Sequence, residues 1–386
     1  MLPLPSGTRH KPRYAPVGAY SSYSSPLSGS AMNVLRTRSR LTNLAVALLL
    51  VVLSLSLLGN LRLLSGKPSH PHSRWHAAWD ELADADILDS GRPPSVETTI
   101  RRDPRMADVD HLVLVPGHAV WLGSDADQAT EDHDWVLEGM QKGGSVRTYI
   151  KHIEKAADMA AQDPHSLLVF SGGATRIQLP SPLSEGASYH RLAAAKGLLN
   201  NTGSNSHLPL SARATTEEFA LDSYENLLFS MARFREVTGH WPSRVSVVGY
   251  GMKQHRFEQL HRGAIRFPAD RFNYVGIDDA GDTSLHYEGE LKYGYAPFLF
   301  APSGCRPPLA TKRAVRNPFS RYPPYHSSTP ELAALLEWCP PSTPIGDVAV
   351  PTTLGESEGM EPPAGFVVYH DKLPWDGLTT WGRERD

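Results

Sequence analysis

The strongest constraint on this chain is an uninterrupted apolar run near its beginning. Residues 41–59 read LTNLAVALLLVVLSLSLLG, which is nineteen residues without a charged side chain. Because a helix rises about 1.5 Å per residue, roughly 20 such residues cross the hydrocarbon core of a bilayer. Four small polar side chains are too few to give a helix here a polar face. We therefore expect one transmembrane helix over 41–60, with the lipid bilayer as its partner.

The charges that flank this run predict its orientation. Residues 1–40 carry six Lys or Arg side chains and no Asp or Glu, and an acidic stretch follows between 80 and 89. The positive-inside rule then predicts a type II signal anchor, with the C-terminal part in the secretory pathway (ER, Golgi or vacuole). A mitochondrial presequence leading to the inner membrane is the alternative, because the first forty residues are rich in Arg and Ser. Five prolines there interrupt any amphipathic helix.

Two weak signals agree with a lumenal position. Asn200 begins the sequon Asn-Asn-Thr, a candidate site for N-glycosylation. Cys305 and Cys339 are the two cysteines of the chain, and they form either one disulfide in an oxidising compartment or two separate buried thiols.

Composition divides the chain into five segments. We expect a disordered cytosolic head over 1–40, the membrane anchor, a polar stalk over 61–105, one α/β domain over 106–345 and an irregular tail over 346–386. The formal net charge of −3 gives no electrostatic reason to expect a nucleic acid partner. No metal site is expected, because the stalk histidines have no partnering Cys or carboxylate.

Short apolar runs alternate with amphipathic stretches from residue 110 onward. Strands are expected over 111–115, 166–170, 244–248 and 272–276, and helices over 145–161, 185–198, 215–238, 254–266 and 329–338. This alternation predicts a three-layer αβα, Rossmann-like fold with a mainly parallel sheet. Ligands of such sheets bind beyond the carboxyl ends of the strands. Glycine follows each expected strand, which predicts a cleft where backbone N–H groups cradle an anion.

The candidate site combines residues that follow the strands with residues on the 215–238 helix, where 218, 222 and 225 share a face. Expected to bind a ligand are Gly117, Ser171, Gly172, Gly173, Ser223, Asn226, Lys253 and Arg256, and expected to act in catalysis are Glu185, Glu225 and His255. Lys253 and Arg256 would hold an anion, and the 171–173 loop would donate N–H groups to it. Glu185 or Glu225 would be the general base. For each charged residue alone, a solvated helix face is the competing interpretation.

The order of these motifs resembles the YdcF-like family, and residues 215–262 look closest to its fungal membrane-anchored members. The matching motifs are Val113–Gly117, Ser171-Gly172-Gly173, Glu185-Gly186, Glu218 with Ser223–Asn226, and Lys253–Arg256, within about 110–280. Gly186 replaces the usual alanine, which we interpret as a mild change. Lys253 stands where bacterial members carry histidine, with His255 as a substitute for proton transfer.

This resemblance implies a Rossmann-like core that binds a nucleotide-like ligand, with S-adenosylmethionine proposed as the cofactor of a bacterial relative. It also implies a link to envelope or membrane-lipid metabolism. From residues and resemblance together we expect an enzyme, a transferase or hydrolase of a phosphate-bearing, nucleotide-like or lipid-linked substrate. The alternative is a non-catalytic module that binds a nucleotide or S-adenosylmethionine. The basic cluster at 312–319 is expected to be a loop that braces the cleft, with anion binding at a membrane as its alternative.

Overall fold

A computed structural model describes residues 40–65, 92–200, 208–354 and 359–377, in two units, Met1–Ala77 and Ala78–Asp386. In the first unit, the helix α2 (Arg40–Ser65) spans 26 residues and includes the predicted anchor. A search of the described residues finds no helix with both the length and the hydropathy needed to cross a membrane. Residues 1–39 of the predicted head and 66–91 of the predicted stalk lie outside the described residues.

The second unit is built around a five-stranded sheet. Its strands are β1 (His111–Pro116), β4 (Ser166–Ser171), β5 (Ala214–Glu217), β6 (Arg244–Gly249) and β7 (Phe272–Gly276). Their order is β5-β4-β1-β6-β7, and all four pairings are parallel. The chain therefore builds outward from β1 in both directions, as in doubly wound α/β folds, with the switch point between β1 and β6. The predicted parallel sheet is confirmed.

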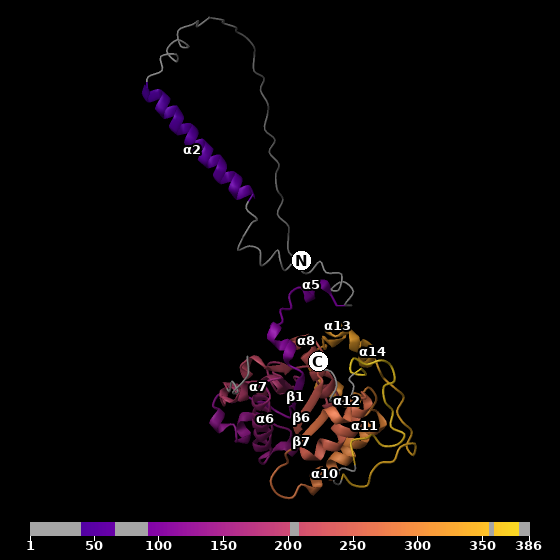
Figure 1. The fold of residues 1–386 in the computed structure, drawn as a ribbon. Helices are drawn as coiled ribbons and strands as arrows, with labels where there is room; N and C mark the ends of the chain where they lie inside the picture. The colour runs from indigo at the N-terminus through magenta and orange to yellow at the C-terminus, as the bar shows by residue number, and fades with distance from the viewer. Residues whose placement is uncertain (1–39, 66–91, 201–207, 355–358, 378–386) are drawn as a thin grey trace, which may run out of the picture. The chain divides into compact units, whose positions relative to one another are not determined.

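Helices cover both faces of this sheet, as Figure 1 shows. Successive residues of a strand point to opposite faces, so Val113 and Val115 enter one hydrophobic core while Leu112 and Leu114 enter the other. The helices α6 (Ser145–Gln162) and α7 (Glu185–Ala195) pack on the first face. The second face carries α8 (Ser223–Thr238) and the π-helix η8 (Arg256–His261).

The helix predicted over 215–238 begins only at Ser223. Residues 214–217 instead form the edge strand β5, which the sequence does not reveal because its threonines replace the apolar residues of a buried strand. Asp222 caps α8 by accepting a hydrogen bond from the Glu225 amide at 3.0 Å. Glu218 and Asp222 thus precede the helix, and the predicted face shared by 218, 222 and 225 is wrong.

The other elements are short. The helix predicted over 254–266 is η8 followed by α9 (Arg262–Ala264), and the one predicted over 329–338 is η11 (Pro330–Leu332) and α14 (Ala333–Leu336). The first part of the basic cluster at 312–319, predicted as a loop, lies in the helix α12 (Leu309–Arg316). The remaining elements are α5 (Pro94–Glu97), η1 (Pro104–Asp108), β2 (Val120–Trp121), η2 (Ala126–Gln128), η3 (Asp132–Asp134), β3 (Trp135–Val136), η4 (Gly139–Gln141), η5 (Leu198–Asn200), η6 (Leu210–Ala212), η7 (Gly251–Lys253), η9 (Ala269–Arg271), α10 (Ser284–Glu290), the π-helix η10 (Leu291–Tyr295), α11 (Ala296–Phe300) and α13 (Tyr325–Ser328).

The described part of the C-terminal tail, residues 346–354 and 359–377, contains no helix and packs on the domain. Tyr369 and Trp375 are buried in the hydrophobic core beside α8, and the Trp375 Nε1 donates a hydrogen bond to the Ile265 carbonyl at 2.8 Å. Cys305 and Cys339 form a disulfide, which decides between the two alternatives left open by the sequence. Asn200 is exposed at the end of η5, and the rest of its sequon lies outside the described residues.

Candidate functional site

A cavity of about 750 Å³ opens at the carboxyl edge of the sheet. Gly117 and His118, which follow β1, line one part of it, and Gly249 and Tyr250, at the end of β6, line another. The cavity therefore lies at the switch point of the sheet, where doubly wound proteins bind their ligands. Its volume falls within the roughly 300–1,000 Å³ typical of small-molecule sites.

The structure brings six of the predicted site residues together and leaves five outside. Those that line the cavity are Gly117, Glu185, Ser223, Asn226, Lys253 and Arg256. Those that do not are Ser171, Gly172, Gly173, Glu225 and His255.

At Gly117 and in the 171–173 loop, the predicted backbone cradle for an anion is not found. The amides of Gly117, Gly172 and Gly173 already donate to the carbonyls of Ser171 (2.6 Å), Glu217 (3.0 Å) and Ala220 (2.7 Å). The first two glycines instead permit close packing, because a Cβ at Gly117 or Gly172 would lie 2.6 or 2.9 Å from the Cβ of Glu185. These two glycines therefore let Glu185 approach the cavity, and their own amides are not free to hold an anion.

Ser171 does not line the cavity itself, but it contacts Asn226, which does. Its buried hydroxyl lies 2.7 Å from Glu217 Oε2 and 2.8 Å from Asn226 Oδ1. The Glu217 carboxylate also accepts hydrogen bonds from the Phe219 amide at 2.7 Å and the Tyr325 hydroxyl at 3.0 Å. Burial raises the pKa of Glu217, and these hydrogen bonds act against the rise. Ser171 therefore positions Asn226.

Glu225 lies in the first turn of α8, where it stabilises the start of the helix, and it does not line the cavity. Its carboxylate accepts from the Leu221 amide at 2.8 Å and pairs with Arg313 Nη1 at 3.1 Å. Arg313 also holds Asp222, with 2.6 Å between Nε and Oδ2. Burial raises the pKa of Glu225 while Arg313 opposes the rise. The general-base role predicted for Glu225 therefore has no geometric support, whereas the bracing role predicted for the basic cluster is found in Arg313.

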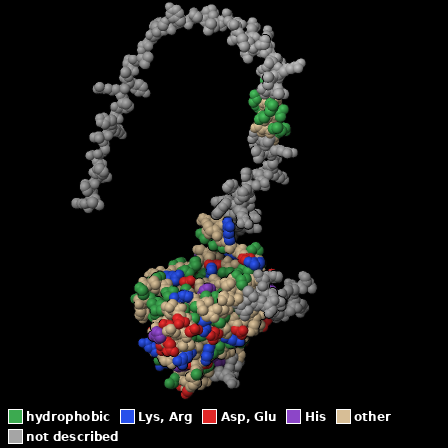
Figure 2. Space-filling view, turned by 90° about the vertical axis from the view of Figure 1, so that its left-hand side faces the viewer, with side chains coloured by type: hydrophobic (Ala, Val, Ile, Leu, Met, Phe, Trp, Pro, Cys, Tyr) green, Lys and Arg blue, Asp and Glu red, His purple; other side chains and the backbone are tan. Residues whose placement is uncertain are grey.

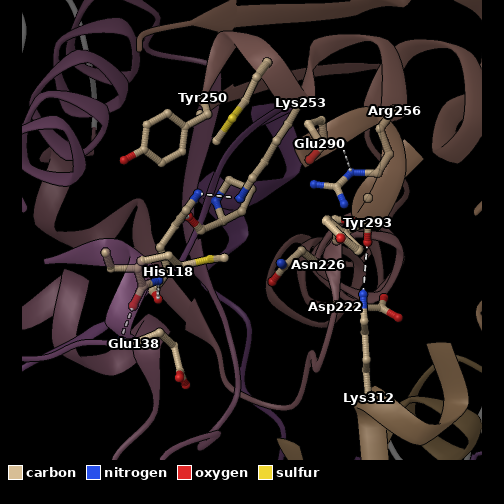
Figure 3. A pocket seen from close by; sticks show the side chains of 18 of the residues that line it. His118, Glu138, Asp222, Asn226, Tyr250, Lys253, Arg256, Glu290, Tyr293 and Lys312 are labelled. Atoms are coloured by element: carbon tan, nitrogen blue, oxygen red, sulfur yellow. Dashed lines mark hydrogen bonds and ion pairs between the residues drawn. The ribbon is translucent and has the colours of Figure 1, made fainter. Parts of the chain in front are cut away.

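A lysine–histidine pair lies beside the switch point (Figure 3). His118 Nδ1 lies 2.8 Å from the Pro116 carbonyl, so Nδ1 carries the proton and Nε2 accepts from Lys253 Nζ at 2.9 Å. Burial, reinforced by Lys253, holds the pKa of His118 well below its usual range, so this ring stays neutral. Burial and then the charge of Arg256 lower the pKa of Lys253 to about 7. Lys253 can therefore gain or lose a proton near neutral pH.

Arg256 and Glu290 form a second pair inside the cavity. Arg256 Nε lies 3.1 Å from Glu290 Oε1, and both side chains are buried. The pair is not aligned as a hydrogen bond, so among the described residues these two atoms have no hydrogen-bond partner. Burial raises the pKa of Glu290, and Arg256 and Lys253 act against the rise. Buried polar atoms without a hydrogen bond are unfavourable, so a hydrogen-bonding group bound in the cavity beside Arg256 would stabilise its guanidinium.

Sequence reasoning missed several lining residues. His118 directly follows Gly117, so its place after a strand was a usable signal, whereas Glu290 comes from α10 and follows no strand. Lys312 and Arg316 of α12 add basic groups, and Glu138, Asp279 and Asp222 add acidic ones. Among the described residues, no three His, Cys, Asp or Glu side chains group as a metal site would require. Figure 2 shows Lys, Arg, Asp and Glu intermingled over one face of the domain, so neither sign dominates that face.

Comparison of the sequence with known proteins finds similarity to an uncharacterized yeast protein. "Uncharacterized protein YOR238W" of Saccharomyces cerevisiae is 28% identical over 260 residues, covering 55% of this chain and 86% of the yeast protein. No family model matches the sequence. No solved structure matches it either. The fold and the site define an α/β protein with a charged cavity at the switch point of a doubly wound parallel sheet.

Proposed function

We propose that this chain is an enzyme, a hydrolase or transferase, that acts on a phosphate-bearing substrate in the switch-point cavity. The observation that carries the proposal is the pairing of two buried basic side chains with two polar partners inside the cavity: Lys253 with His118, and Arg256 with Glu290. A guanidinium offers several N–H donors, and charge-assisted hydrogen bonds to phosphate oxygens are the strongest that such donors make. The phosphate would thus be held by side chains and not by a glycine loop.

The same groups supply a route for protons. In hydrolysis, water forms a bond to phosphorus, the Glu185 carboxylate accepts a proton from that water, and the bond from phosphorus to the leaving oxygen breaks. Protonated Lys253 donates its proton to that oxygen, and solvent returns the proton from Glu185 to the amine. In transfer, an acceptor hydroxyl takes the place of water. Neutral His118 accepts the Lys253 hydrogen bond and so orients the amine.

We also propose that the domain is YdcF-like and works on the lumenal side of the secretory pathway, tethered by residues 41–60. The motif order, the apolar run and the Cys305–Cys339 disulfide support this setting. Endoglycosidase treatment of the chain from cells is expected to increase its mobility on a gel, and the Asn200→Gln variant is expected to show no such shift. A native chain that never carries a glycan in cells would count against a lumenal domain.

Turnover separates an enzyme from a binding module. The full chain in phosphatidylcholine nanodiscs is incubated with p-nitrophenyl phosphate, geranyl diphosphate and a UDP-sugar, and released phosphate or nucleotide is measured. We expect release from at least one substrate, lost in Lys253→Met and retained in Lys151→Met, whose side chain is exposed on α6. Binding of a nucleotide or S-adenosylmethionine without any product over a long incubation would overturn the enzymatic proposal and favour the module.

A further inference from the structure

Apolar side chains gather at the mouth of the cavity. Four large hydrophobic residues that line it are nonetheless strongly exposed: Met140 (90%), Leu285 (76%), Tyr293 (61%) and Val315 (74%). Single exposed apolar residues are common on soluble proteins, but a group around one cavity marks a binding surface. They come from three separate stretches of the chain, so the group is assembled by the fold.

Basic side chains stand among these apolar ones. Lys312, Val315 and Arg316 are spaced three and four residues apart on α12, so they share one face of the helix. Lys312 Nζ donates to the Tyr293 carbonyl at 2.9 Å, which ties α12 to η10. In the view of Figure 3, Tyr293 and Lys312 lie on the other side of the cavity from His118 and Glu138. The mouth is therefore cationic and apolar, whereas the interior carries the polar pairs.

We infer that the substrate is an amphiphile, a phosphate or diphosphate ester of a long apolar chain; this inference rests on the proposed function. The ester's anionic head would enter toward Arg256 and Lys253, and Leu285, Val315 and Met140 would cover the first part of its chain. A nucleotide fits less well, because its base requires hydrogen-bond partners, and the four apolar side chains carry one polar group between them, the Tyr293 hydroxyl. Charge and apolar surface together match an anionic amphiphile.

Alkyl phosphates of increasing length test this inference. Inorganic phosphate and ethyl, butyl, hexyl and octyl phosphate are titrated into the full chain in phosphatidylcholine nanodiscs, and empty nanodiscs give the correction for partitioning. Each methylene that becomes buried is expected to tighten binding about threefold to fourfold, the equivalent of ~0.8 kcal/mol. The Leu285→Ser/Val315→Ser double variant is expected to lose this gain and to keep its affinity for inorganic phosphate.

Two other exposed apolar residues provide the matched control. Tyr322→Ser/Ile345→Ser changes exposed side chains outside the cavity lining and is expected to keep the native dependence on chain length. Affinity independent of length, or a gain that survives in Leu285→Ser/Val315→Ser, would overturn the inference while leaving phosphate binding intact. Failure of every probe, inorganic phosphate included, would overturn the proposed function and the inference with it.

Discussion

Lys253 illustrates how position sets the chemistry of a single residue. The sequence places it after a buried strand and so predicts a cation near the ligand site. The sequence does not reveal that its amine meets His118 Nε2 at 2.9 Å, because the two residues are distant in the chain and meet only where β1 and β6 lie side by side. The sequence thus predicts an anion-binding role for Lys253, whereas its surroundings in the structure also allow it to exchange protons.

The lowered pKa of Lys253 predicts a specific dependence of stability on pH. An unfolded lysine titrates near pH ~10.4, whereas burial brings the pKa of Lys253 to about 7. Between these values the unfolded chain binds the extra proton, so this residue makes folding stability rise with pH. The native chain is therefore expected to gain thermal stability relative to the Lys253→Met variant as the pH rises from 7 to 10. The difference between the two thermal midpoints, variant minus native, falls accordingly.

Calorimetry of both chains from pH 6 to 10 measures this difference. Lys151→Met, in which an exposed lysine of α6 is replaced, is the control and is expected to show a constant difference. A constant difference for Lys253→Met would show that its amine titrates as an ordinary lysine.

A triad of Ser246, His111 and Asp163 shows why geometry alone does not define a site. His111 Nδ1 lies 2.8 Å from Asp163 Oδ2, and its Nε2 lies 2.9 Å from Ser246 Oγ. This resembles the arrangement of serine hydrolases. However, His111 begins β1 at the amino edge of the sheet, and none of the three lines the cavity. We interpret the triad as a buried polar network that joins β1, β6 and the end of α6.

At the scale of elements, the sequence predicts what apolar periodicity encodes. In the five-stranded sheet, four strands have mostly apolar sequences and are found where expected, whereas the polar edge strand β5 is missed. The π-helices η8 and η10 are also missed, because their hydrogen-bond spacing differs from that of an α-helix, whose period of 3.6 residues the sequence analysis relies on. These two π-helices begin at Arg256 and directly after Glu290, so they carry part of the site that sequence reasoning could not place.

Gly186 is the residue on which the packing of α7 depends most clearly. From the sequence, glycine in place of the alanine usual at this position is interpreted as a mild change. In the structure, however, a Cβ at Gly186 would lie 2.6 Å from both the Glu217 and Phe170 carbonyl oxygens. Gly186→Ala is therefore expected to push α7 away from β4 and β5 and to lower the free energy of unfolding by about 1–3 kcal/mol. Denaturant unfolding followed by tryptophan fluorescence measures this loss.

Gly139→Ala is the matched control, because a Cβ at that glycine would meet nothing within 4 Å. It is expected to leave the free energy of unfolding nearly unchanged. If Gly186→Ala proved as stable as Gly139→Ala, the close approach of α7 to the sheet edge would be contradicted, and with it the placement of Glu185 in the cavity.

At the scale of the molecule, segments distant in sequence complete the core. Large apolar side chains such as Trp375 suggest that the tail docks on the fold, but without periodicity the sequence does not show where they pack. The disulfide joins Cys305 to Cys339, 34 positions away, and encloses α12 and its basic residues. The disulfide thus closes the segment that supplies Lys312, Val315 and Arg316 to the cavity.

Removing this disulfide is expected to lower stability, because the cross-link restricts the unfolded chain. For a loop of this length the expected loss in the free energy of unfolding is about 2–4 kcal/mol. Urea unfolding with and without a phosphine reductant measures it. The Cys305→Ser/Cys339→Ser double variant should match the reduced native chain and respond to reductant no further. A native chain indifferent to reductant would show that the bond does not stabilise the fold.

The most direct test of the central claim is the affinity of the full chain for inorganic phosphate, measured by isothermal titration calorimetry in phosphatidylcholine nanodiscs. Arg256→Ala is expected to weaken binding at least tenfold, which is about 1.4 kcal/mol, with its circular dichroism spectrum unchanged. Lys151→Ala should bind as the native chain does. An Arg256→Ala variant that folds and binds phosphate with native affinity would contradict the claim that this cavity holds a phosphate group.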